Sequence, residues 1–133
     1  DVVVAVEFKL GAAHRLASSD DVADGEMILD AGAESVVAAI AFLDRCSAIV
    51  WNGPMGAFEI PPFDAATTAL ARAVATKTQN DGLMSVAGGG DTMAALANAG
   101  VNDQFSYVST AGGAFLEWLE GKRLPGVEAL RIN

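Results

Sequence analysis

Short runs of apolar residues recur along the chain, separated by longer stretches in which apolar positions follow a helical period. The runs lie at residues 2–6, 27–29, 48–51, 83–87 and 107–109. Short uninterrupted runs of this kind are typical of strands that are buried on both faces of a parallel sheet. The first run follows Asp1 directly, so we interpret it as a central strand of such a sheet and expect the natural chain to begin earlier.

The intervening stretches predict helices at residues 34–45, 64–77, 91–99 and 113–120. The expected core face of the first helix consists of Val36, Val37, Ile40 and Leu43. Asp64 is the expected N-cap of the second helix, and Gly100 and Gly121 are expected to end the third and fourth. Strands that alternate with helices predict β-α-β units around a parallel sheet, which binds ligands at the carboxyl ends of its strands.

Glycine-rich turns follow three of the apolar runs, at residues 52–56, 88–90 and 111–113. In the second turn, a buried strand leads into Gly88, Gly89 and Gly90, and Asp91 and Thr92 then open a helix. Glycines let the backbone approach a ligand closely, and the first turn of a helix offers free N–H groups to an anion. Asp91 could hold a divalent cation beside a phosphate. A tight turn capped by Asp91 or Thr92 explains the segment equally well.

The turn after residues 48–51 has the sequence WNGPMGAFE at residues 51–59. Its Gly-Pro pair and second glycine predict a compact, rigid loop. Asn52 and Glu59 are then polar groups on a fixed frame, with an apolar floor from Met55, Ala57 and Phe58. This composition suits an adenosine, with a slot for the base and a carboxylate for the ribose hydroxyls. A structural turn whose Asn and Glu face solvent is the alternative.

The third turn, at residues 109–115, again leads from a strand through glycines into a helix. Two helix N-termini that converge on one sheet edge could replace the positive charge that the composition lacks, because the net charge is −9 and the basic residues are scattered. With that charge, nucleic-acid binding through bulk electrostatics is not expected.

Several other residues are expected to be structural. Cys46, the only cysteine, lies in an apolar stretch and is expected to be a buried, inert thiol. Met84, Met93 and Trp118 are expected to fill gaps in the core. His14, the only histidine, has no partner at ligand spacing and is expected on the surface. No apolar run reaches membrane-spanning length, so we expect a cytoplasmic protein that does not associate with membranes.

Three strings resemble the phosphoglycerate kinase family in order and spacing: WNGPMGAFE at 51–59, GGGDT at 88–92 and STAGGAFLEWLEGKRLPGVEAL at 109–130. MILD at residues 27–30 resembles the family's segment before its adenine pocket. The resemblance implies an α/β fold, Rossmann-like and three-layered (α-β-α) with a mainly parallel sheet, of which this chain holds an incomplete domain. Residues 1–123 would be the later part of the C-terminal nucleotide-binding domain, and residues 124–133 the C-terminal tail.

The implied activity is reversible phosphoryl transfer between ATP and 3-phosphoglycerate, giving ADP and 1,3-bisphosphoglycerate in glycolysis. By position, Glu59 holds the ribose hydroxyls and Asp91 holds Mg²⁺. The other implied nucleotide contacts are Gly88, Gly89, Gly90, Thr92 and Asn52 near the phosphates, and Leu29, Pro54 and Ala57 beside the base. The second substrate, 3-phosphoglycerate, would bind through an N-terminal domain that this chain lacks. The full-length enzyme is expected to be a monomer.

The chain departs from the family pattern at two positions. Ala111 stands where the family has a glycine, and its Cβ either crowds that loop or is tolerated there; Ile28 is bulkier than the family residue and would narrow that wall of the adenine pocket. The family's basic cluster for phosphoglycerate matches nothing here, so no catalytic residue is assigned. Two alternatives to the kinase hypothesis follow: a non-catalytic nucleotide-binding or interaction module, or a structural fragment that binds nothing. The parent protein is expected to be a kinase, and this chain alone is expected to be inactive.

Overall fold

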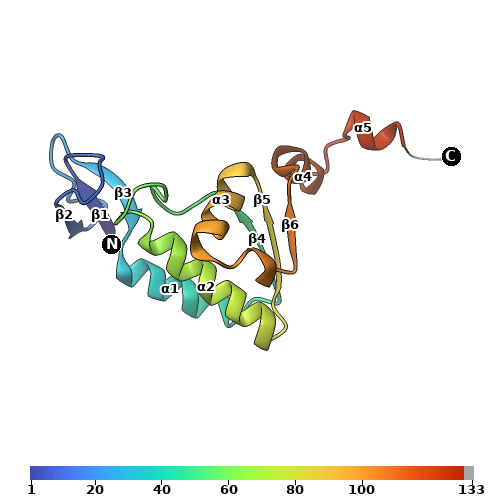
Figure 1. Ribbon diagram of the computed structural model, residues 1–133, viewed down its shortest axis with the longest axis horizontal. Coiled ribbons are helices and arrows are strands. Elements are labelled where there is room, and N and C mark those ends of the chain that lie inside the picture. Colours follow the sequence, from blue (N-terminus) through green and yellow to red (C-terminus); the bar gives the residue numbers. More distant parts are fainter. Residues whose placement is uncertain (131–133) are drawn as a thin grey trace.

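The strands of the chain form two separate sheets, as the computed structural model shows for residues 1–130 (Figure 1). The first sheet is antiparallel and has the order β2-β1-β3; its strands are β1 (Val2–Ala5), β2 (His14–Ala17) and β3 (Met27–Ala31). The second sheet is parallel and has the order β4-β5-β6; its strands are β4 (Ala48–Asn52), β5 (Met84–Gly88) and β6 (Tyr107–Ser109). The predicted α/β class with a parallel sheet is confirmed.

The placement predicted for the first apolar run is wrong. Strand β1 is central in its sheet, but both of its neighbours are antiparallel, and the strand ends at Ala5, so that Val6 is 66% exposed. A run of apolar residues indicates that a strand is buried, but it does not indicate whether the neighbouring strands are parallel or antiparallel. The connection through residues 6–13 contains no helix, and a parallel neighbour would need a longer crossover.

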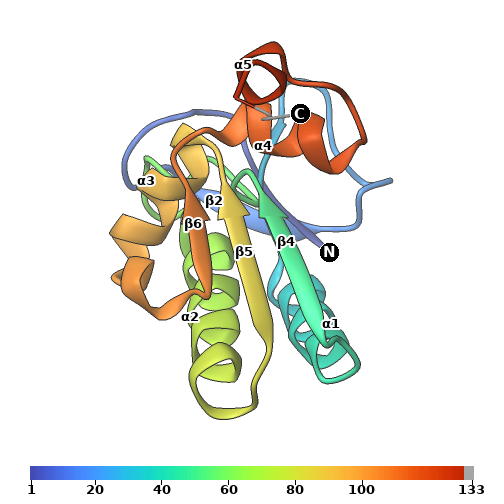
Figure 2. The ribbon, with the colours of Figure 1, turned by 90° about the vertical axis from the view of Figure 1, so that its right-hand side faces the viewer.

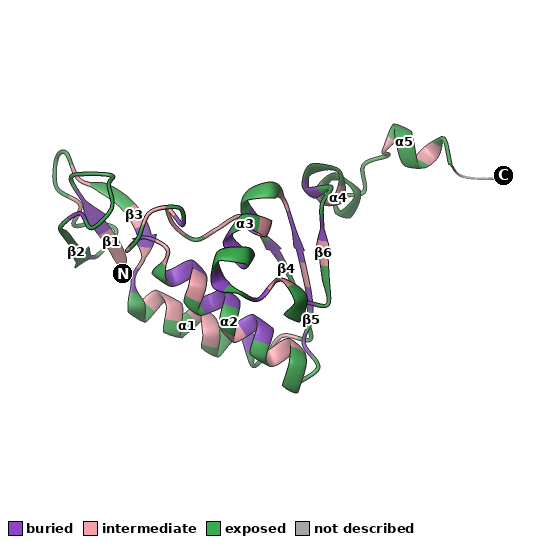
Figure 3. Cartoon of the chain, in the orientation of Figure 1, coloured by how far each residue is buried: buried purple, intermediate pink, exposed green. Residues whose placement is uncertain are grey.

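The helices α1 (Ala33–Leu43), α2 (Ala65–Asn80) and α3 (Gly90–Ala99) cover one face of the parallel sheet (Figure 2). The core beneath them combines Trp51 of β4 and Ala87 of β5 with Leu70 and Val74 of α2 and Leu96 of α3. Figure 3 shows this layer as a line of buried residues along α2. The predicted face of α1 is corrected at one position, because Val37 is 67% exposed.

The opposite face of the parallel sheet is largely bare in the described residues. Val50, Met84 and Tyr107 point to this face and are each more than half exposed. Coverage comes from α4 (Gly112–Leu119), whose Phe115 ring lies 6.4 Å from that of Tyr107. The predicted core position of Met84 is therefore wrong, because side chains alternate between the faces of a strand.

Four other expectations for side chains have mixed outcomes. Trp118 was expected in the core and is 56% exposed. Met93 and Cys46 are only half-buried, and the Cys46 Sγ lies 3.5 Å from the carbonyl oxygen of Phe42. His14 is exposed, as expected, although it lies in β2 and its ring meets that of Phe63 edge-on.

Glycine marks the helix ends where the sequence predicted it. Gly100 follows α3 with φ +74°, and Gly121 lies beyond α4 with φ +81°. The short helices η1 (Asn102–Gln104) and α5 (Pro125–Glu128) complete the described elements. No helix within residues 1–130 is both long and apolar enough to span a bilayer.

Candidate functional site

The loops that follow β4, β5 and β6 leave the parallel sheet at the same level. Asn52, the last residue of β4, pairs with Gly88 of β5, and Gly88 pairs with Ser109 of β6. All three strands therefore end in one row across the sheet. This is the edge at which parallel sheets bind ligands.

A hydrogen bond joins the first two of these loops. The Gly53 N–H donates to Thr92 Oγ1 at 2.7 Å; Thr92 is only 1% exposed and Gly53 is half-buried, so the bond is partly buried. Gly89 has φ +107°, a conformation that favours glycine, and a Cβ at this residue would lie 3.9 Å from Asn52 Oδ1. The glycine turn and Asn52 thus lie against each other.

The second and third loops are in backbone contact. A Cβ at Gly112 would collide with the N and Cα atoms of Gly89, and a Cβ at Gly88 would lie 3.3 Å from the Phe115 ring. Since α3 begins at Gly90 and α4 begins at Gly112, the two helix N-termini lie beside each other. Their first-turn N–H groups and the positive ends of two helix dipoles converge, as the sequence predicted.

Of the two outcomes open for Ala111, crowding of the loop and toleration, the structure shows toleration. Its side chain is exposed, and the close approach of the two loops occurs at the next residue, Gly112. Ile28 is likewise 53% exposed, in β3. The restrictive position in the third loop is Gly112, which sequence reasoning included in the turn without singling it out.

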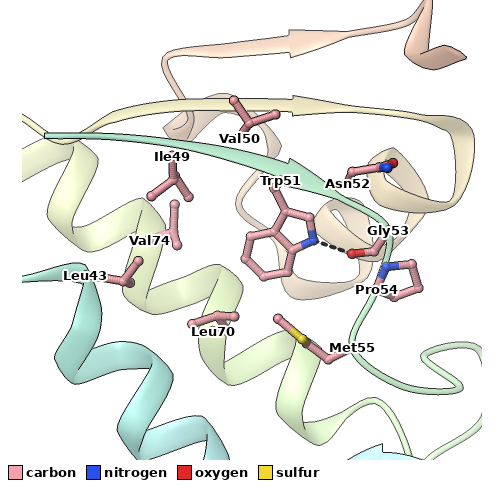
Figure 4. A pocket seen from close by; sticks show the side chains of 10 residues that line it. All are labelled: Leu43, Ile49, Val50, Trp51, Asn52, Gly53, Pro54, Met55, Leu70 and Val74. Carbon is pink, nitrogen blue, oxygen red and sulfur yellow. Dashed lines mark hydrogen bonds between the residues drawn. The ribbon is translucent and has the colours of Figure 1, made fainter. Parts of the chain in front are cut away.

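The loop after β4 is fixed to the sheet and to α2. The Trp51 indole N–H donates to the Gly53 carbonyl at 2.6 Å (Figure 4). The Met55 N–H donates to Thr67 Oγ1 of α2 at 3.0 Å. Both anchors are buried, since Trp51 is 6% and Thr67 1% exposed. The loop is therefore anchored by side chains that the Gly-Pro pattern does not reveal, and its rigidity stays a prediction.

An apolar pocket of about 290 Å³ lies between this strand and the helices. Its walls come from α1, β4, the following loop and α2, and its lining residues are Leu43, Ile49, Val50, Trp51, Asn52, Gly53, Pro54, Met55, Leu70 and Val74 (Figure 4). Two predicted site residues, Asn52 and Pro54, belong to this lining. In Figure 4 the Asn52 side chain points away from the indole of Trp51.

The remaining predicted residues lie at the border with the antiparallel sheet. The Ala57 N–H donates to the Leu29 carbonyl at 2.8 Å, and both side chains pack on a second small core around Phe63. Phe58, expected in the floor of the site, is buried. Glu59 follows in the same loop and is exposed to solvent. The structure thus brings Leu29 and Ala57 together.

Asp91 is exposed in the first turn of α3, one residue after Gly90. No group of three or more His, Cys, Asp or Glu side chains within residues 1–130 could enclose a metal ion. A single exposed carboxylate nevertheless fits Mg²⁺, which keeps several waters and binds through one or two carboxylates together with substrate phosphates.

Asp30 is a residue of this region that sequence reasoning left without a role. It ends the apolar part of β3, is 2% exposed, and accepts a hydrogen bond from the Ala66 N–H of α2 at 2.9 Å. Asp64 occupies the N-cap position of α2, as predicted, but its side chain makes no cap hydrogen bond. The signal in the sequence was a carboxylate within an otherwise apolar strand.

The sequence model of the phosphoglycerate kinase family matches residues 1–122. The chain belongs to the phosphoglycerate kinase family. It is 66% identical over 131 residues to the phosphoglycerate kinase of Xanthobacter autotrophicus, covering 98% of this chain and 33% of that relative. It is 61% identical over 133 residues to the phosphoglycerate kinase of Methylobacterium radiotolerans, covering 100% of this chain and 33% of that relative.

Solved phosphoglycerate kinase structures share the fold described above. The enzyme from Coxiella burnetii superposes with a TM-score of 0.86 at 46% identity, over 96% of this chain and 32% of that structure. The enzyme from Pyrococcus horikoshii gives a TM-score of 0.68 at 33% identity, over 79% of this chain and 25% of that structure. The chain spans about a third of the length of the phosphoglycerate kinases that it matches.

Proposed function

We propose that this chain forms the Mg-nucleotide half of a phosphoglycerate kinase active site. Residues 1–123 would be the later part of the C-terminal nucleotide-binding domain, and residues 124–133 a tail, of which 131–133 lie outside the described residues. The whole enzyme would transfer a phosphoryl group reversibly between ATP and 3-phosphoglycerate. The observation that carries the proposal is the contact between Gly89 and Gly112, which joins two helix N-termini at the carboxyl edge of a parallel sheet.

The phosphates of ATP or ADP would bind at these two helix N-termini. In-line phosphoryl transfer requires positioning and charge stabilisation more than covalent chemistry, and preorganised N–H groups supply both. The N–H groups of residues 88–92 would face the phosphates, with Asn52 beside them. This arrangement suits a chain whose net charge is −9, because the positive potential comes from the backbone.

Asp91 would hold the Mg²⁺ that accompanies the nucleotide. The ion would offset the negative charge of the phosphate oxygens. Asp91 would hold this ion from the first turn of α3, where its side chain is exposed.

The adenosine would lie against the loop after β4. Leu29, Pro54 and Ala57 would contact the base, and Glu59 would accept hydrogen bonds from the ribose hydroxyls. The support for this placement is the fixed position of the loop, since Ala57 is bonded to Leu29 and Met55 to Thr67. A rigid loop loses little conformational entropy when the ligand binds.

The 3-phosphoglycerate and the basic residues that recognise it would belong to the remainder of a longer protein. The full-length enzyme would be a cytoplasmic monomer, and this chain alone would be inactive. A coupled assay separates this proposal from a binding-only module: the full-length protein should form ATP from 1,3-bisphosphoglycerate and ADP.

Titration with a fluorescent ADP analogue and Mg²⁺ tests the site in this chain. Saturable binding that is weakened by Asp91→Asn and competed by unlabelled ADP supports the proposal. A chain that is folded by circular dichroism and gives no saturable signal would refute a preformed nucleotide site. ATP formation by the isolated chain would refute the assignment of the remaining catalytic groups to another domain.

A further inference from the structure

Asp30 is the only buried carboxylate among residues 1–130, and it joins three elements. One oxygen, Oδ2, accepts from the Ala66 N–H in the first turn of α2 at 2.9 Å. The other, Oδ1, accepts from the N–H of Ala31 in its own strand, β3, also at 2.9 Å. The third element is the loop after β4, which contacts this carboxylate through Gly56.

Gly56 lies directly on the Asp30 carboxylate. A Cβ at Gly56 would collide with Asp30 Oδ1, and it would lie 2.6 Å from Asp30 Cγ and 2.7 Å from the Leu29 carbonyl oxygen. The next residue, Ala57, is hydrogen-bonded to that same carbonyl. The height of residues 56–57 above β3 is therefore set by Asp30 and Leu29.

Asp30 caps α2 and also contacts a second element, because its Oδ2 accepts from Ala66 while its Oδ1 side lies against Gly56. Asp64 already occupies the N-cap position of α2, and its side chain makes no cap hydrogen bond. The hydrogen bond to Ala66 comes instead from a strand 36 residues away in sequence. Burial, partly offset by the two backbone hydrogen bonds, raises the pKa of Asp30, so its placement costs free energy that a solvent-exposed cap would not.

We propose that Asp30 is a positioning residue for the nucleotide, holding the loop of residues 53–59 at the height over β3 that nucleotide binding requires. This inference rests on the proposed function, because Pro54, Ala57 and Glu59 of this loop are the predicted contacts to adenosine. Asp30 acts through the loop and touches no reacting group.

The test is the Asp30→Asn variant of the full-length protein, with Asp64→Asn as the matched control at the same helix terminus. Asparagine keeps the size of the side chain and one acceptor oxygen, but its NH₂ group cannot accept from a backbone N–H. We expect the KM and Kd for MgADP to rise about tenfold in Asp30→Asn. The KM for 1,3-bisphosphoglycerate and kcat at saturating nucleotide should stay within twofold, and Asp64→Asn should stay within twofold in every constant.

Gly56→Ala tests the same contact from the loop and does not depend on Asp30→Asn folding well. It should also raise the Kd for MgADP while kcat at saturating nucleotide is kept. Urea unfolding of each variant is measured beside the binding constants. An affinity loss at unchanged kcat, in variants that are more than 95% folded under assay conditions, supports a positioning role.

Two results would overturn the positioning role of Asp30. One is a nucleotide affinity in Asp30→Asn and Gly56→Ala equal to that of the wild type; the other is a fall in kcat together with a rise in the KM of both substrates. The proposed function fails separately, through a wild-type protein that does not bind MgADP at all.

Discussion

Gly112→Ala is expected to destabilise the protein by an amount that can be worked out from the structure. The new methyl group would collide with the backbone of Gly89 and lie 3.2 Å from the carbonyl carbon of Gly88. Backbone atoms at the start of a helix cannot rotate away as a side chain can. Relief therefore requires α4 and the glycine turn to move apart.

Gly113→Ala is the matched control, because nothing lies within 4 Å of a Cβ at that residue. Both glycines are in the first turn of α4 and neither has positive φ, so both gain a similar helix-propensity term, up to about 1 kcal/mol. Overpacking of a filled site costs about 1–3 kcal/mol. The propensity term cancels in the comparison, and the stabilities of the two variants should differ by about 1–3 kcal/mol.

Urea unfolding followed by far-UV circular dichroism measures this difference. With an m-value of about 2 kcal/mol per molar for a small domain, a gap of about 2 kcal/mol separates the midpoints by about 1 M. Gly113→Ala should unfold at or above the wild-type midpoint, and Gly112→Ala below it. Coincident midpoints would show that α4 does not contact the glycine turn in solution, and the two-helix phosphate site would then have no structural basis.

Three further predictions concern other residues of the candidate site and its supports. Thr92→Val should lower the free energy of unfolding by about 1 kcal/mol, because the partly buried Gly53 N–H loses its acceptor, whereas Thr92→Ser should stay close to wild type in the same urea titration. In the full-length enzyme, Asp91→Ala should lower kcat far more than Glu59→Ala, which should mainly raise the nucleotide KM; equal losses in kcat in steady-state assays would contradict these roles. Burial raises the pKa of Asp30 in the folded state, so the free energy of unfolding should fall as the pH rises from the pKa of the unfolded chain to that of the folded chain. Asp30→Asn should flatten this pH dependence in urea titrations repeated across the range.

The parallel sheet and its helices were predictable because apolar runs mark the strands and glycines mark the turns and helix ends. The runs at 48–51, 83–87 and 107–109 became β4, β5 and β6, and glycines with positive φ end α3 and follow α4. Convergence of the glycine turns follows from the parallel direction of the strands alone. This part of the candidate site could therefore be predicted from the sequence.

The antiparallel half was not predictable by the same reasoning. The run at residues 2–6 has the composition of a central parallel strand, and only the length of the connection after it distinguishes a parallel from an antiparallel neighbour.

Contacts between segments far apart in sequence were also not predictable. Asp30 caps a helix that begins 35 residues later, and local pattern assigns that cap to Asp64. The common placement of Glu59 and Asp91 around one nucleotide stays a prediction.

The row formed by Asn52, Gly88 and Ser109 has a consequence for engineering this segment. A residue inserted within β4, β5 or β6 would raise one loop by about 3.3 Å relative to its neighbours and exchange the faces of the side chains beyond it. Length changes should be tolerated at the opposite end of the sheet, in turns such as the one at Asp81 and Gly82, which are exposed. Affinity tags, fluorophores and circular-permutation sites therefore belong there.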